Sequence, residues 1–367
     1  MQPINIKPLT GLRFLAASWV VLFHYWPKLA TPWVAPLVQK GYLGVELFFV
    51  LSGFILCHVY LDAFGERRFS YGGFLWARLA RIYPLHLATL LGVGAMALAA
   101  GAAGYPVDKS VLAWSSLPAN LTLTQAWGLA PEAGWNHPSW SISAEWFAYL
   151  NFPLCAGLAW SLRRRPYLAT ASALALLFGL YALFPRLAGF PLDEATIAWG
   201  ALRIVPCFAY GAAIYLVWRS NLIATRAMAA SGAVFFGALV VLVSALSAAD
   251  VMIVTLFGPL ILCLAGLTST GSRLGSGAVF VYLGEISFAV YMVCIPWSLV
   301  FVNVMVRVLH TPNKQLPITA WVIMLIGVPA LAAAAHHLVE RPARAAMRAW
   351  ADSWAARDDR RRGNILA

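Results

Sequence analysis

Two ionisable residues, Arg13 and His24, lie within one apolar stretch that is long enough to cross a membrane, residues 10–27. The eleven residues of helix between them turn the azimuth by about 1100°, close to three full turns, so both side chains share one face. The rise of the helix separates them by roughly 16 Å. A charged group at membrane depth is costly, and it usually faces a protein interior and marks function. The alternative is that each side chain snorkels to the nearer lipid headgroups.

The chemistry open to His24 is that of a general base. Burial and a nearby cation both favour the neutral imidazole, which can accept a proton. A buried histidine that is satisfied by a neighbouring hydroxyl is the alternative interpretation.

A second polar group opens the third apolar stretch, where Arg78 and Arg81 are three residues apart and share a helix face. Such arginines commonly anchor a helix at the cytoplasmic side. They also suit an anionic ligand that carries phosphates, because the guanidinium fork binds phosphate through two hydrogen bonds. Tyr83 and His86 continue the polar character deeper into the same helix, which favours a ligand path over simple anchoring.

A third group begins the fourth apolar stretch, where Ser141 and Glu145 are four residues apart on one helix face. A buried carboxylate must be paired or protonated. Because no basic residue is nearby in the sequence, the partner of Glu145 must come from another helix, and Arg13 or His24 are the candidates. The pair would either hold the bundle together or orient the histidine.

The remaining candidate residues lie in or directly after the last two predicted spans. Glu285 and Tyr291 could line the same cavity, whereas Glu340 and Arg341 are interpreted as a structural pair before Pro342, which is expected to end the last span. The sequence contains no P-loop, GxGxxG, HExxH or GxSxG motif and no metal-ligand spacing. The five cysteines fall in separate apolar segments and are interpreted as buried free thiols.

The amino-acid composition of the whole chain indicates a protein that is embedded in a lipid bilayer. The chain has 367 residues, of which 61% are hydrophobic and 11% are charged, and its mean hydropathy is +0.75. Soluble domains carry about 25% charged residues. We therefore predict an all-α, polytopic membrane bundle of about ten helices. The expected spans are residues 10–27, 43–62, 75–99, 139–160, 167–185, 198–218, 228–248, 251–270, 280–304 and 318–338.

The placement of basic residues predicts the orientation. With the N-terminus in the cytoplasm, ten spans place most lysines and arginines in inner loops, so both termini are expected to be cytoplasmic. The net charge of +12 then reflects topology and not nucleic-acid binding. We expect a membrane domain over residues 1–340, with a retained first span, and a charged cytoplasmic tail over residues 341–367.

Residues 100–138 form one long connection on the outer side, and they are rich in tryptophan and proline. Aromatic residues gather at membrane interfaces, so an aromatic belt explains them. The alternative is a platform that covers a cavity and receives an acceptor on the outer side.

Five runs in this order resemble the acyltransferase 3 family of membrane-bound acyltransferases, in its stand-alone form without a fused periplasmic domain. They are GLRFLAASWVVLFH, GVELFFVLSGFIL at residues 44–56, RLAR at 78–81, WSISAEW at 140–146 and ERP at 340–342. The resemblance implies a multi-pass protein of the bacterial inner membrane that moves an acyl group, most commonly acetyl, from cytoplasmic acyl-CoA to a hydroxyl of a carbohydrate or glycan.

By motif position, the resemblance implies that Arg13 and His24 are the catalytic pair and that Arg78 and Arg81 serve the donor. Acyl-CoA is then a substrate, and no tightly bound cofactor is expected. We expect His24 to take the proton of the acceptor hydroxyl, with Glu145 as its orienting or charge-stabilising group. An acyl-histidine intermediate is an open alternative.

Two other classes fit intramembrane charge. A transporter or flippase for a glycan or lipid-linked sugar would need no acyl-CoA and would leave its substrate unchanged. Its usual internal repeat is not visible in this sequence. A scaffold of a polysaccharide-synthesis complex would tolerate loss of His24. The sequence does not identify the acceptor, the hydroxyl position, the acyl length or the oligomeric state.

Overall fold

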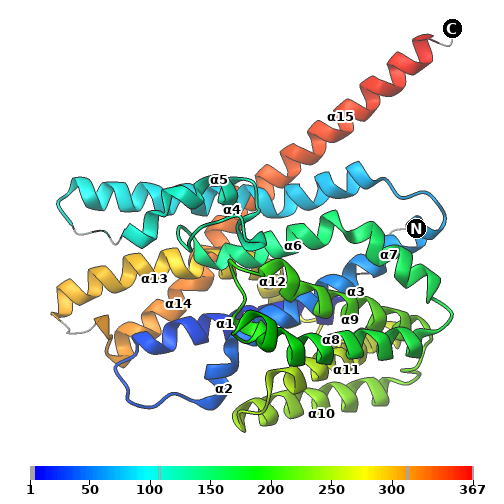
Figure 1. Ribbon diagram of the computed structural model, residues 1–367, viewed down its shortest axis with the longest axis horizontal. Helices are drawn as coiled ribbons and strands as arrows, with labels where there is room; N and C mark the ends of the chain where they lie inside the picture. The colour runs from blue at the N-terminus through cyan, green and yellow to red at the C-terminus, as the bar shows by residue number, and fades with distance from the viewer. Residues whose placement is uncertain (1–4, 106, 108, 311–313, 366–367) are drawn as a thin grey trace.

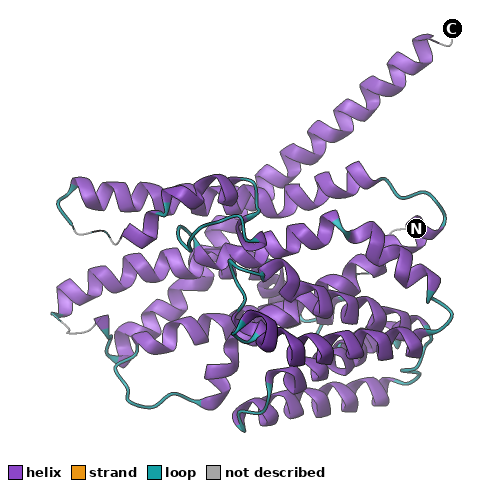
Figure 2. Ribbon diagram, in the orientation of Figure 1, coloured by secondary structure: helices purple, strands orange, loops and turns teal. Residues whose placement is uncertain are grey.

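The computed structural model describes residues 5–105, 107, 109–310 and 314–365, and this part of the chain is helical without a β-strand (Figures 1 and 2). The last two residues of the expected cytoplasmic tail, 366 and 367, lie outside the described residues. Short 3₁₀ turns occupy several of the connections. The α-helices are α1 (Lys7–Tyr25), α2 (Pro36–Gln39), α3 (Gly44–Gly65), α4 (Tyr71–Ala102), α5 (Leu117–Leu121), α6 (Trp140–Leu150), α7 (Phe152–Ser161), α8 (Pro166–Ala188), α9 (Gly200–Arg219), α10 (Arg226–Ala245), α11 (Asp250–Ser269), α12 (Ala278–Glu285), α13 (Ser287–Leu309), α14 (Ile318–Ala335) and α15 (Arg341–Ile365).

The long helices run side by side as a membrane bundle (Figure 1). Within the described residues, eight helical segments are long and apolar enough to cross a membrane. They include α3, α4, α8, α9, α10, α11, α13 and α14, so the all-α polytopic fold is confirmed. Of the ten expected spans, α1 and the α6–α7 pair do not meet this criterion of length and hydropathy, and the count of ten stays a prediction.

Two of the expected continuous spans are broken. The stretch 139–160 divides at Asn151 into α6 and α7, and the stretch 280–304 divides at Ile286 into α12 and α13. At the first break Asn151 donates its side-chain amide to the carbonyl of Phe147, and the ring of Pro153 is accommodated in the first turn of α7. At the second break Ser287 donates to the carbonyl of Gly284. Hydropathy windows do not report such breaks, because the residues around each break are mostly apolar.

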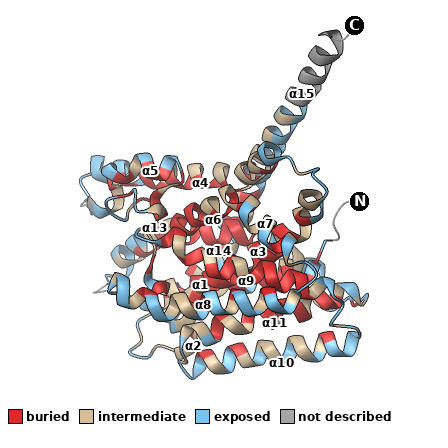
Figure 3. Cartoon of the chain, turned by 45° about the vertical axis from the view of Figure 1, so that its right-hand side comes forward, coloured by how far each residue is buried: buried red, intermediate tan, exposed pale blue. Residues whose placement is uncertain are grey.

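The core is built around the close contact of α3 and α9, which lie in the buried centre of the bundle (Figure 3). Gly53 and Gly211 make this contact possible. A Cβ on Gly53 would lie 2.0 Å from the carbonyl oxygen of Phe208, and a Cβ on Gly211 would lie 1.9 Å from that of Val50. Small residues at these positions therefore let the two backbones touch.

The expected helix stop at Pro342 is wrong. A π-helical turn over His336–Glu340 joins α14 directly to α15, and α15 continues to Ile365. Pro342 is the second residue of α15, directly after the π turn, and it has no N–H to donate to the continuous helix. The extra residue of the π turn gives the chain room for the proline ring.

The long connection over residues 100–138 packs on the bundle through its polar groups. The indole of Trp127 donates to the carbonyl of Ser143, and Asn136 donates its side-chain amide to the carbonyl of Met292. Gln125 is buried and donates to Ser139. These bonds fix the chain that enters α6, and residues 106 and 108 of the connection lie outside the described part.

Candidate active site

Two cavities lie inside the bundle, and we name them by their polar lining. The arginine pocket, of about 130 Å³, is lined by Arg13, Arg78, Arg81, Glu145 and apolar side chains of α3, α4, α6 and α13. The histidine pocket, of about 380 Å³, is lined by His24, His137, Asp193, Glu194 and Arg203, among others. Val45 and Tyr291 line both cavities, so these two residues stand between them.

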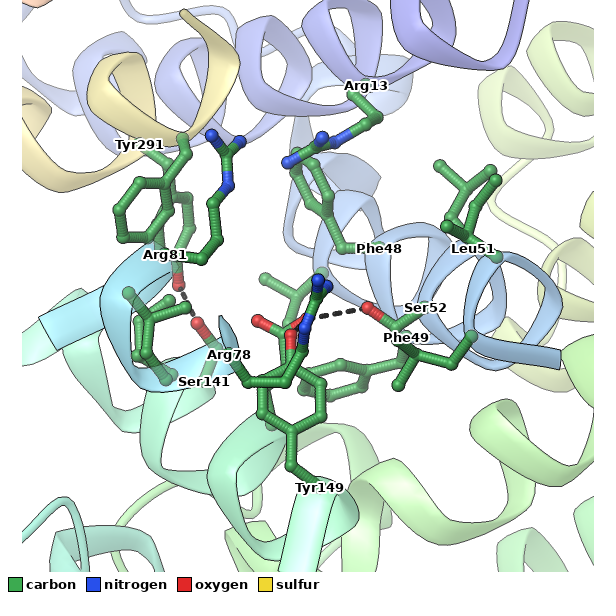
Figure 4. Close-up of a pocket in the computed structure, with 17 residues that line it drawn as sticks. Arg13, Phe48, Phe49, Leu51, Ser52, Arg78, Arg81, Ser141, Tyr149 and Tyr291 are labelled. Atoms are coloured by element: carbon green, nitrogen blue, oxygen red, sulfur yellow. Dashed lines mark hydrogen bonds between the residues drawn. The ribbon is translucent and has the colours of Figure 1, made fainter. Parts of the chain in front are cut away.

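Three helices bring guanidinium groups and a carboxylate to the arginine pocket (Figure 4). Arg13 comes from α1, whereas Arg78 and Arg81 come from neighbouring turns of α4 and share one face. The carboxylate of Glu145 accepts hydrogen bonds from Ser52 Oγ at 2.6 Å and from Tyr149 OH at 2.5 Å. These hydroxyl groups supply the hydrogen bonds of Glu145, for which the sequence suggested Arg13 or His24.

Arg81 is paired with a carboxylate that is far away in the sequence. Its guanidinium forms an ion pair with Glu340, which is fully buried at the π turn and also contacts His336 Nδ1 at 2.9 Å. The sequence interpretation of a structural pair between Glu340 and Arg341 is therefore wrong in its partner, because the π turn points Glu340 toward α4. The ERP run thus connects the start of α15 to the arginine pocket.

The histidine pocket places two imidazoles beside two carboxyl groups. His24 comes from the last turn of α1, and His137 comes from the 3₁₀ turn that precedes α6. Burial lowers the pKa of His137, which keeps its imidazole neutral at pH 7. Asp193 and Glu194 enter the pocket from the connection between α8 and α9. A neutral imidazole in a cavity of this size can accept a proton from a bound hydroxyl.

Asp193 has an unusual environment. Burial and the neighbouring carboxylate of Asp250 raise the pKa of Asp193 from 3.8 to about 6. Asp250 is itself held by Lys40 Nζ at 2.6 Å and by Tyr42 OH at 2.7 Å. Asp193 therefore changes its charge near pH 6, at the wall of the histidine pocket.

A buried ion pair adjoins the histidine pocket, because one of its members, Arg203, also lines that pocket. Arg203 of α9 donates from Nε to Glu46 Oε1 of α3 at 2.5 Å, and both side chains are almost fully buried. The Arg203 guanidinium also lies 4.7 Å from the centre of the Trp140 ring. The sequence analysis missed this pair, although Arg203 lies inside the predicted span 198–218 and so needed an acidic partner.

The other candidate residues divide between the pockets and the connection over residues 100–138. Ser141 and Tyr291 line the arginine pocket, and Ser141 Oγ donates to Tyr291 OH at 2.8 Å. Tyr83 and His86 do not line either pocket, because they bond the carbonyls of Leu121 and Asn120 at 3.1 and 2.8 Å. Glu285 is exposed at the end of α12.

The described residues contain no group of three or more His, Cys, Asp or Glu side chains that is arranged to hold a metal ion. The polar groups of both pockets are suited to binding organic anions and hydroxyl groups, through the guanidinium groups of the arginine pocket and the imidazole nitrogens of the histidine pocket.

These features define a polytopic, all-helical membrane protein with a polar site lined by its helices and their connections. Comparison with known proteins gives the family: the acyltransferase domain of acyltransferase 3 matches residues 6–337, so the chain belongs to this family. Acyltransferase MdmB of Streptomyces mycarofaciens is 31% identical over 316 residues, which cover 79% of this chain and 78% of the relative. Protein 2 in the picA locus of Rhizobium radiobacter is 33% identical over 152 residues, which cover 37% of this chain and 75% of the relative.

No solved structure matches this chain. The family and the relatives support a membrane acyltransferase, which uses an acyl donor and an acceptor. The resemblance that was drawn from the five sequence runs is thereby confirmed.

Proposed function

We propose that this protein transfers an acetyl group from cytoplasmic acetyl-CoA to a hydroxyl of a carbohydrate acceptor at the outer side of the bacterial plasma membrane. The observation that carries the proposal is the pair of pockets that meet at Val45 and Tyr291. The lining of the arginine pocket has three guanidinium groups, and that of the histidine pocket has two imidazoles and one guanidinium group. An anionic donor and a hydroxyl acceptor thus have separate cavities with one common wall.

The arginine pocket suits the donor. Its lining has three guanidinium groups, from Arg13, Arg78 and Arg81, and one carboxylate, from Glu145. This surplus of positive charge favours the anionic donor, whose acyl end would extend toward the wall shared with the histidine pocket.

The histidine pocket suits the acceptor. In the proposed reaction His24 takes the proton of the acceptor hydroxyl as its oxygen attacks the thioester carbonyl carbon. The C–S bond then breaks, the acyl group stays on the acceptor oxygen, and the thiolate of coenzyme A takes up a proton. Glu145 acts from the donor side, because it lines the pocket of Arg13 and not that of His24.

The test is acetyl-CoA consumption by purified protein in nanodiscs with a panel of methyl glycosides, together with direct binding of acetyl-CoA. We expect His24→Ala to lower transfer by about 10²- to 10⁴-fold, the usual contribution of a general base, with unchanged thermal stability. The matched control is His337→Ala, because His337 is exposed and lines neither pocket.

An active His24→Ala enzyme would remove the base assignment. Folded wild-type protein that neither binds acetyl-CoA nor consumes it would overturn the proposed function. Movement of an unmodified glycan across the membrane would then support a transporter.

A further inference from the structure

The start of α15 is fastened to α4 beside the arginine pocket. The Trp76 indole donates to the carbonyl of Met347 at 2.8 Å, and the rings of Trp76 and Trp350 are 4.9 Å apart. Figure 1 shows α15 passing α4 and then projecting beyond the bundle. The described face of α15 nearest the bundle is therefore held at a defined place.

Four guanidinium groups converge at this contact. Arg78 and Arg81 belong to α4, and Arg344 and Arg348 lie one turn apart on α15. Arg344 Nη1 lies 3.8 Å from Glu340 Oε1, the same carboxylate that pairs with Arg81. The positive charges of the other three arginines repel that of Arg344.

Charge compensation at this cluster is incomplete. Glu340 is the one carboxylate that pairs with these arginines among the ion pairs of the described residues, and it is shared with His336. The Nε–H of Arg78 is buried and has no hydrogen-bond partner in the described structure. Its Nη2 has only a long contact of 3.4 Å with Tyr60 OH. A buried guanidinium donor without a partner is costly, and a bound anion would supply the missing acceptor.

Anchoring at the cytoplasmic side explains the presence of arginines but not their convergence. Anchoring residues point outward to lipid headgroups, whereas Arg78 and Arg81 line the internal pocket. The cluster thus leads from the exposed Arg348, past the half-buried Arg344, into the cavity. An extended anion with several phosphates at one end fits this gradient of exposure.

We propose that Arg344 and Arg348 of α15, together with Arg78 and Arg81, form the binding site for the phosphate groups at the nucleotide end of the donor. The inference rests on the proposed function in naming acyl-CoA as the donor. It adds that α15 is part of the donor site, and that the π turn at Glu340 exists to bring this helix against α4.

The first measurement is the binding of adenosine 3′,5′-bisphosphate, the nucleotide end of coenzyme A without its acyl arm, to the full-length protein in neutral detergent. We expect wild-type protein to bind it, and we expect Arg344→Gln and Arg348→Gln each to weaken binding by on the order of tenfold, as for a lost hydrogen bond to a charged group. The matched control is Arg226→Gln, because Arg226 is exposed at the start of α10 and lines neither pocket.

The second measurement compares acetyl-CoA with acetyl-pantetheine, which lacks the nucleotide. We expect the two substitutions on α15 to raise KM for acetyl-CoA with little change in kcat, and to leave the kinetics with acetyl-pantetheine unchanged. An equal loss with both donors would mean that the substitutions damage the fold, and it would overturn the assignment, as would wild-type kinetics with both.

An anionic lipid headgroup carries the same phosphate chemistry, so nanodiscs with and without phosphatidylglycerol form the third arm. If wild-type protein fails to bind adenosine 3′,5′-bisphosphate while Arg344→Gln and Arg348→Gln lose phosphatidylglycerol, the site is a lipid site and the proposal falls. Nucleotide binding that depends on Arg344, in a protein without transferase activity, would keep the phosphate site and refute the proposed reaction instead.

Discussion

The ion pair between Glu46 and Arg203 offers the most quantitative test of how the histidine pocket is supported. The exposed fractions of the two residues are 0% and 3%, and their contact joins α3 to α9 at the core of the bundle. Removal of one member of a buried pair costs about 3–5 kcal/mol, because the other charge stays buried without compensation. Replacement of both members by neutral groups can be nearly neutral, since neither charge is left alone.

We therefore expect Glu46→Gln to lower the free energy of unfolding by about 3–5 kcal/mol, because it leaves Arg203 charged next to an amide. Arg203→Met should cost a similar amount, since it also removes the donor to the Ala195 carbonyl and the stacking on Trp140. The double variant should recover at least about 2 kcal/mol relative to the sum of the two single losses.

The assay is a double-mutant cycle on purified protein in mixed micelles, with unfolding followed by circular dichroism as dodecyl sulfate is added. Additive losses, with a coupling energy near zero, would refute the reasoning, because the two charges would then act independently despite a separation of 2.5 Å.

Two further predictions concern packing and pH. Gly53→Ala should destabilise the protein by about 1–3 kcal/mol, measured as a lower thermal midpoint, whereas Gly72→Ala should not, because a Cβ on Gly72 meets no atom within 4 Å. The raised pKa of Asp193 means that the folded state binds a proton between pH 3.8 and about 6 that the unfolded state lacks. Thermal stability should therefore fall as the pH rises from 3.8 to about 6 and level off above that, and Asp193→Asn should flatten this dependence. An unchanged pH profile in the variant would contradict the assigned environment beside Asp250.

Hydropathy predicts the membrane architecture well, because a long apolar helix has few alternatives in lipid. The stretches that became α8, α9, α10 and α11 each lie within a few residues of their predicted ends. The division of 139–160 into α6 and α7 was missed for a physical reason. A break within a mostly apolar stretch changes hydrogen bonding and direction but has little effect on the transfer energy on which the prediction depends.

The placement of the site was harder to predict, because its partners are distant along the chain. Arg203 is 157 positions from Glu46, and Arg81 is 259 positions from Glu340. The sequence could state that each buried charge needs a partner, but only the packing of helices decides which one it finds. The helical spacing of Arg78 and Arg81 did predict correctly that both face one side of α4, since that depends on local geometry alone.

In the proposed function, the separation of the two pockets makes the spacing of Arg13 and His24 more important than any direct contact between them. The two residues share a face of α1 but line different cavities, and Val45 and Tyr291 stand between these cavities. Because one helix supplies a side chain to each cavity, both side chains must keep their directions around the helix axis. One inserted residue would rotate His24 by about 100° relative to Arg13. His24 would then leave its pocket although both residue types remained. The rigid helix thus fixes the distance over which the donor must reach, so the reacting carbon is expected where the pockets meet, beside Tyr291.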